Sequence, residues 1–140
     1  MTGQATKTVL KGGCLCGAVT FEATGVFDRF FLCHCERCRK GTGTAHAANV
    51  FSTDFELTWL SGEGNTTKFL VEGTRHSRHF CNTCGSPLPR TSADGVRLVV
   101  PAGSLETPLH LRPEAHIFTA SRADWDDELE NVPAFPGFPS

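Results

Sequence analysis

Two cysteine pairs decide the fold: Gly12-Gly13-Cys14-Leu15-Cys16-Gly17 near the start of the chain, and Cys81-Asn82-Thr83-Cys84-Gly85-Ser86 past its middle. In a flat strand, side chains two residues apart share a face but lie roughly 6–7 Å from each other. Two sulfurs on one tetrahedral zinc ion are only about 3.8 Å apart, because each Zn–S bond is about 2.3 Å long. The backbone must therefore bend at the first pair, and the flanking glycines permit such a bend.

We predict that Cys14, Cys16, Cys81 and Cys84 together hold one structural zinc ion. A C-x-x-C pair followed by glycine is the usual sequence of a zinc knuckle. The alternatives are unliganded buried cysteines or a redox pair, but a redox C-x-x-C usually sits in a βαβ pattern, which this sequence lacks. An iron–sulfur cluster is a further alternative, and a colourless purified protein would exclude it.

A second group, Cys33, Cys35 and Cys38, brings three thiols into one short segment. The chain has seven cysteines, so no eighth is left to complete this group. Three protein ligands and one open position are what a catalytic zinc ion requires. His34 could close the site as a fourth ligand, but in an extended C-H-C segment its ring points to the opposite side. An empty or partly occupied site is the remaining alternative.

Basic residues surround the second cysteine group. Arg37, Arg39 and Lys40 could offset the charge of the thiolates and receive the carboxylates of an acidic thiol ligand. They could equally be solvated surface residues. Another basic stretch, 75–79, directly precedes the Cys81 pair and could lie near either cysteine group or form an exposed strand.

Composition narrows the class of protein. An odd number of cysteines excludes complete disulfide pairing within one chain and favours reduced thiols. The formal net charge of −2 disfavours binding to a phosphate backbone. The first residues, 1–13, lack the apolar stretch of a signal peptide, and no run of apolar residues is long enough to span a membrane. We therefore expect a cytoplasmic protein without nucleic-acid or membrane partners.

Short apolar-alternating segments joined by glycine and proline predict a mainly β fold with few short helices. Its length of 140 residues suits a single domain over 1–140, with tails at 1–8 and 133–140. The aromatic residues of the second tail, Phe135 and Phe138, could belong to a partly ordered end or pack onto the domain or a partner. We expect strands at 19–23, 29–33, 49–52, 55–60, 67–71, 77–80, 97–100 and 115–118, and single helical turns at 36–41 and 124–129.

The order and spacing of the seven cysteines resemble the glutathione-dependent formaldehyde-activating family, which also contains centromere protein V. The resemblance covers about residues 10–135. Its matching elements are Gly13-Cys14-Leu15-Cys16-Gly17-Ala18-Val19, Cys33-His34-Cys35-Glu36-Arg37-Cys38-Arg39-Lys40, Phe80-Cys81-Asn82-Thr83-Cys84-Gly85-Ser86, His116-Ile117-Phe118 and Trp125.

This resemblance implies a tent-like fold of antiparallel sheets and two zinc ions per chain. One zinc would be structural, at Cys14, Cys16, Cys81 and Cys84, and the other catalytic, at Cys33, Cys35 and Cys38. The implied activity is that of a carbon–sulfur lyase acting on the adduct of formaldehyde, or a related aldehyde, with a small thiol such as glutathione. His34 or His46 could transfer the proton, since histidine titrates near neutral pH. The alternative function is a non-enzymatic zinc module that binds a partner protein.

Overall fold

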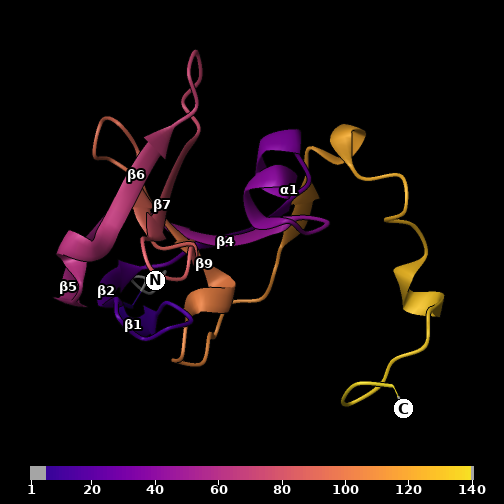
Figure 1. The fold of residues 1–140 in the computed structure, drawn as a ribbon, viewed down its shortest axis with the longest axis horizontal. Helices are drawn as coiled ribbons and strands as arrows, with labels where there is room; N and C mark the ends of the chain where they lie inside the picture. The colour runs from indigo at the N-terminus through magenta and orange to yellow at the C-terminus, as the bar shows by residue number, and fades with distance from the viewer. Residues whose placement is uncertain (1–5, 140) are drawn as a thin grey trace, which may run out of the picture.

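The computed structural model describes residues 6–139 and contains mostly β-strands, as the sequence predicts (Figure 1). Residues 1–5 and Ser140, which belong to the two expected tails, lie outside the described residues. The strands are β1 (Thr8–Gly13), β2 (Thr20–Val26), β3 (Arg29–Cys33), β4 (Ala47–Ser52), β5 (Asp54–Ser61), β6 (Thr66–Leu70), β7 (Ser77–Cys81), β8 (Arg90–Thr91), β9 (Leu98–Pro101) and β10 (Ala115–Ile117).

One α-helix, α1 (Glu36–Thr42), follows β3, and four short 3₁₀ turns complete the regular structure. These turns are η1 (Glu63–Asn65), η2 (Ala102–Ser104), η3 (Thr119–Ser121) and η4 (Leu129–Asn131). Across residues 6–139, no helix has the length and apolarity needed to cross a membrane.

The strands form three sheets with the orders β1-β2-β5, β10-β3-β4-β9-β8 and β6-β7. All pairs are antiparallel except β10 with β3, which run parallel and place Ile117 opposite Cys33. The prediction of antiparallel sheets is therefore confirmed, with one parallel edge strand added. That edge strand brings the chain after residue 115 beside the end of β3, where the second cysteine group begins.

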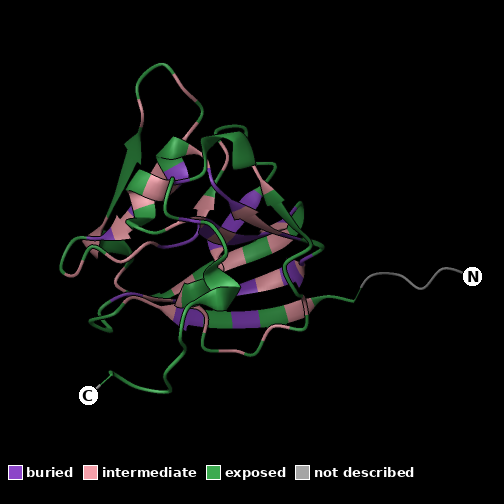
Figure 2. Ribbon diagram, turned by 90° about the vertical axis from the view of Figure 1, so that its right-hand side faces the viewer, coloured by how far each residue is buried: buried purple, intermediate pink, exposed green. Residues whose placement is uncertain are grey.

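The main core lies between the sheets, where the alternation of apolar and polar residues along the strands puts one face inside (Figure 2). Phe21 and Val50 are fully buried, and Cys81 lies in the same cluster. A separate, smaller cluster contains Cys33, Cys38 and Ala47. Of the first cysteine group, Cys81 belongs to the main core and Cys14 and Cys84 pack against it, whereas the second group has little apolar packing of its own.

The expected helical turn at 36–41 is confirmed, and it is two turns long. Cys35 caps it, because its sulfur accepts a hydrogen bond from the backbone N–H of Cys38 at 3.3 Å. Gly43 ends the helix in the left-handed conformation, and its N–H donates to the carbonyl of Arg39.

The expected helical turn at 124–129 is wrong: residues 124–128 form turns and bends, and the 3₁₀ turn η4 begins only at Leu129. A short helix needs an apolar face packed against the protein, but Trp125 and Leu129 are 59% and 42% exposed. From residue 122 the chain runs away from the sheets as an extended arm (Figure 1). Phe135 and Phe138 are 59% and 97% exposed, so neither packs onto the sheets.

Candidate metal centre and binding cavity

The first cysteine group brings together sulfurs from two segments about 65 residues apart in the sequence. Cys14 and Cys16 follow β1, whereas Cys81 ends β7 and Cys84 lies in the turn after it. The Sγ atoms of Cys14 and Cys16 are 3.6 Å apart, and those of Cys16 and Cys81 are 3.8 Å apart. A disulfide requires about 2.05 Å, whereas two sulfurs on one zinc ion lie about 3.8 Å apart. All four ligand atoms lie within 4.8 Å of one another, as one metal ion requires.

Backbone turns aim these sulfurs at a common point. Gly17 and Gly85 adopt positive φ angles of 81° and 76°, which close the two turns after the cysteine pairs. The N–H of Val19 donates to the sulfur of Cys14 at 3.2 Å, and the N–H of Thr83 donates to that of Cys81 at 3.3 Å. Burial opposes ionisation of Cys14, but the hydrogen bond from Val19 lowers the pKa of Cys14 and so favours the thiolate form that a metal needs.

The second cysteine group is compact and has three members. Cys33 ends β3, Cys35 precedes α1 and Cys38 lies in the first turn of α1, and their sulfurs are within 4.8 Å of one another. Cys33 and Cys38 are both 8% exposed. Within residues 6–139, no histidine, aspartate or glutamate completes this group. The arrangement offers three ligands and leaves room for a fourth from outside the chain.

The electrostatics of the three thiols fit a cation. Burial, with the repulsion of the neighbouring sulfurs, raises the pKa of Cys33 and Cys38. Burial also opposes ionisation of Cys35, but the N–H of Cys38 lowers the pKa of Cys35 overall. Three thiolates this close repel one another unless a positive ion sits among them. Both cysteine groups could therefore hold a metal ion, and their all-sulfur composition is consistent with zinc.

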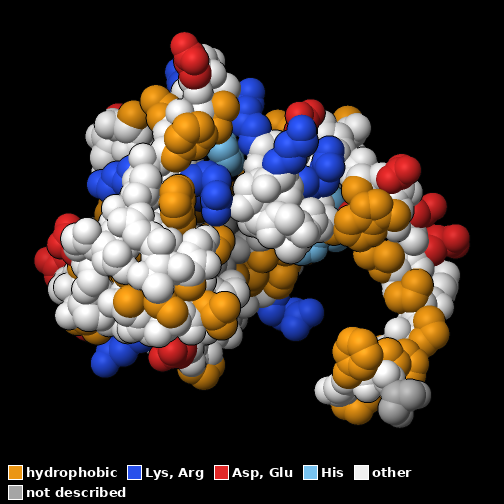
Figure 3. Space-filling model, viewed as in Figure 1, with side chains coloured by type: hydrophobic (Ala, Val, Ile, Leu, Met, Phe, Trp, Pro, Cys, Tyr) orange, Lys and Arg blue, Asp and Glu red, His pale blue; other side chains and the backbone are white. Residues whose placement is uncertain are grey.

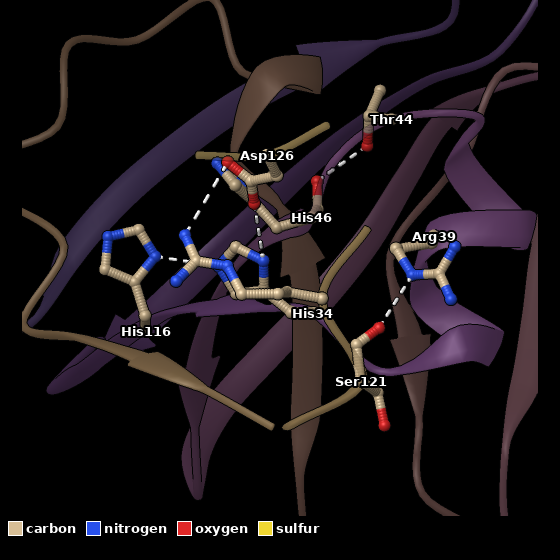
Figure 4. A network of polar contacts seen from close by, with 8 residues as sticks. His34, Arg39, Thr44, His46, His116, Ser121 and Asp126 are labelled. Atoms are coloured by element: carbon tan, nitrogen blue, oxygen red, sulfur yellow. Dashed lines mark hydrogen bonds and ion pairs between the residues drawn. The ribbon is translucent and has the colours of Figure 1, made fainter. Parts of the chain in front are cut away.

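His34 takes no part in the group of sulfurs, although it lies between two of them in sequence. Its Nε2 is 2.8 Å from Nδ1 of His116, and its Nδ1 is 3.1 Å from Oδ2 of Asp126 (Figure 4). Burial lowers the pKa of His34, which is 1% exposed. The ring of His46 packs edge-on against the ring of His34, with centroids 5.2 Å apart.

A cavity of about 500 Å³ lies beside both cysteine groups, because Cys14 and Cys38 both line it. His46 lines it as well, whereas His34 does not. The remaining walls come largely from α1, β4 and the segments before and after the Cys81 pair. A molecule in this cavity would contact the second cysteine group at Cys38.

Cations gather around the cavity. Figure 3 shows Lys, Arg and His side chains on the face where β6, β7 and α1 lie. Arg37 and Arg78 line the cavity, together with His76 and Arg90. Burial lowers the pKa of Arg90, while the sulfur of Cys38 opposes this effect. None of these arginines has an acidic side chain within 4.0 Å among residues 6–139.

The three basic residues singled out from the sequence have different positions. Arg37 lines the cavity, but Arg39 donates to the backbone carbonyl of Ser121 at 3.1 Å, and Lys40 pairs with Glu36 at 3.3 Å. Arg78 belongs to the basic stretch 75–79. Arg90 carries no local sequence signal and reaches the cavity only because β8 pairs with β9.

Comparison with known proteins agrees with this architecture. No curated protein sequence matches the chain. A solved structure of a Rhodobacter sphaeroides protein is 28% identical with a TM-score of 0.57, and the match covers 76% of this chain and 98% of that one. The family model for the glutathione-dependent formaldehyde-activating enzyme matches residues 9–121, which include all seven cysteines. The chain therefore belongs to the glutathione-dependent formaldehyde-activating enzyme family.

Proposed function

We propose that this protein is a zinc-dependent carbon–sulfur lyase acting on the adduct of a glutathione-type thiol with formaldehyde or a related aldehyde. One observation carries the proposal: a three-cysteine group without a fourth ligand among residues 6–139 opens onto a cavity lined by arginines. Family membership supports the same chemistry.

The reaction conserves all atoms and needs no oxidant. In the forward direction the thiol sulfur bonds to the aldehyde carbon, the C=O π bond breaks, and the thiol proton passes to the oxygen. The reverse reaction breaks the C–S bond and releases thiol and aldehyde. A zinc ion held by Cys33, Cys35 and Cys38 would supply Lewis-acid character, which lowers the pKa of a thiol or polarises a carbonyl.

The arginines of the cavity would bind and orient the thiol. A glutathione-type molecule carries carboxylates, and a guanidinium holds a carboxylate with two parallel hydrogen bonds. Arg37, Arg78 and Arg90 line the cavity from three different elements. Carboxylates held at these positions would leave the thiol end of the molecule within the same cavity as Cys38.

His46 is the better placed of the two candidate proton-transfer residues. It lines the cavity, and its buried Nδ1 has no hydrogen-bond partner among residues 6–139. By contrast, His34 does not line the cavity, and its two ring nitrogens face His116 and Asp126. We therefore assign proton transfer between sulfur and oxygen to His46, and we give His34 a different role below.

The test measures exchange between formaldehyde, glutathione and their adduct at equilibrium by NMR, with zinc content determined on the same sample. We expect the wild-type protein to make exchange faster than the uncatalysed addition. The Cys38→Ser variant should show only the uncatalysed rate. If the wild-type protein with full zinc occupancy did not raise the exchange rate, the proposed activity would be excluded and the non-enzymatic zinc module would be favoured. Replacing glutathione by 2-mercaptoethanol, which has no carboxylate, provides a matched substrate control and should weaken binding.

A further inference from the structure

The loop that carries the second cysteine group is held by a residue from the C-terminal arm. Asp126 lies beyond residues 9–121, which the family model matches. Its Oδ2 is 3.1 Å from Nδ1 of His34, the residue between Cys33 and Cys35 (Figure 4). Almost all of the arm around Asp126 is exposed, yet Asp126 itself is 6% exposed. Asp126 and Ala123 are the buried residues of the described arm, and Asp126 is the one with a charged side chain.

Burial makes the contact between these two side chains strong. An unpaired carboxylate in a buried position is costly, so it stays there only when other groups compensate its charge. Oδ2 of Asp126 and Nδ1 of His34 lie 3.1 Å apart as an ion-pair contact, and neither atom makes a hydrogen bond among residues 6–139. Each is therefore the polar group that compensates the burial of the other. Arg122 adds a second, more distant contact, with its Nη2 3.8 Å from Oδ1 of Asp126.

The other side of the His34 ring is fixed as well. Nε2 of His34 shares a hydrogen bond with Nδ1 of His116 at 2.8 Å, and a hydrogen placed on Nδ1 of His34, toward the carboxylate of Asp126, makes Nε2 the acceptor of that bond. The backbone N–H of His34 also donates to the carbonyl of Ile117 at 2.9 Å. Three contacts therefore fix this residue to β10 and to the arm.

This cluster of histidines and aspartate is not a third metal site. Only the two cysteine groups bring three ligand atoms within 4.8 Å of one another in the part of the chain that the structure describes. The 2.8 Å separation between the nitrogens of His34 and His116 is that of a hydrogen bond. The histidine and aspartate side chains can therefore act on the second cysteine group only through His34, which lies between Cys33 and Cys35 in the sequence.

We propose that Asp126 is a positioning residue for the second cysteine group. By holding the His34 ring, it fixes the backbone of the loop so that the sulfurs of Cys33 and Cys35 converge with that of Cys38 before a metal binds. Preorganised ligands lose less conformational entropy on binding, so the metal binds more tightly. This inference rests on the proposed function only in taking the three-cysteine group to be a zinc site.

The experiment compares zinc affinity at the two cysteine groups of the full-length protein, using competition with a chelator of known affinity. In Asp126→Asn we expect the second group to lose about tenfold or more in zinc affinity, as is usual when a group that orients metal ligands is removed. The first group should keep its zinc and report that the variant is folded. Asp127→Asn, at the exposed neighbouring position, is the matched control and should behave as wild type.

The charge-conserving Asp126→Glu variant should recover part of the lost affinity, which a general loss of folding would not allow. Equal second-site affinities in Asp126→Asn and Asp127→Asn would overturn the inference, as would parallel loss of zinc from both groups. A wild-type protein that holds zinc only at the first group would instead exclude the proposed zinc site, and the inference with it. Binding of two zinc ions without catalysed exchange would exclude the proposed activity, while the affinity comparison would still decide the role of Asp126.

Discussion

Cys14 of the first cysteine group and Cys38 of the second line the same cavity. The two groups nevertheless differ in their surroundings. Cys81 of the first group is completely buried within the main core, whereas Cys33 and Cys38 belong to a small cluster of their own. Loss of a cysteine should therefore affect the stability of the protein differently at the two groups, although both consist of cysteines.

We predict that Cys81→Ser abolishes folding, whereas Cys38→Ser yields a folded protein without the second metal. Loss of Cys81 removes a ligand that ties β7 to the segment after β1, and metal binding and folding are coupled at such sites. Circular dichroism and zinc content distinguish the two outcomes. Similar unfolding of both variants would show that the second group is also structural.

The sequence predicts the strands and the cysteine groups well because their signals are local. The expected strand at 29–33 agrees with β3 at both ends, and the remaining expected strands overlap β2, β4, β5, β6, β7, β9 and β10. The two strands not expected are β1, which ends in two glycines, and β8, which has two residues. Gly12 is required in β1, because a Cβ at this position would collide with the backbone oxygen of Ser104.

The cavity and its neighbours are harder to predict, because they depend on contacts between distant segments. Arg90 approaches Cys38 only through the pairing of β8 with β9. Asp126 reaches His34 only because β10 runs parallel to β3 and brings the arm beside the second cysteine group. Neither residue stands in a sequence pattern that indicates its partner.

We predict that Arg90→Gln raises the KM for glutathione about 10- to 100-fold. A hydrogen bond to a charged group contributes about 1.5–3 kcal/mol, and each 1.4 kcal/mol changes affinity tenfold. The KM for 2-mercaptoethanol should change little, because this thiol has no carboxylate. Arg97→Gln is a suitable control, since Arg97 is exposed and lies outside the cavity. An equal increase in KM for both thiols would contradict carboxylate binding by Arg90.

We predict that Gly62→Ala destabilises the protein by more than about 2 kcal/mol. Gly62 has a φ angle of 75°, and a non-glycine residue held in such a conformation costs about 1–3 kcal/mol. In addition, its Cβ would collide with the carbonyl oxygen of Ala18. Gly64→Ala should change stability far less, because no atom lies within 4 Å of a Cβ there. Urea unfolding of both variants measures the difference, and equal midpoints would contradict the prediction.

We predict that two truncations of the C-terminal arm differ in their effect on stability and zinc content. Truncation after Val132 removes Phe135 and Phe138, whose side chains are 59% and 97% exposed, so we expect unchanged zinc content and unfolding midpoint. Truncation after Arg122 also removes the buried carboxylate of Asp126, which lies 3.1 Å from Nδ1 of His34. Without this contact no polar group compensates the burial of Nδ1, and a buried polar group left in this way costs about 1–3 kcal/mol. The shorter protein should therefore unfold at lower urea concentration and release its second zinc ion first. If both truncated proteins matched the full-length chain in unfolding and in zinc release, the arm would have no part in holding the second cysteine group.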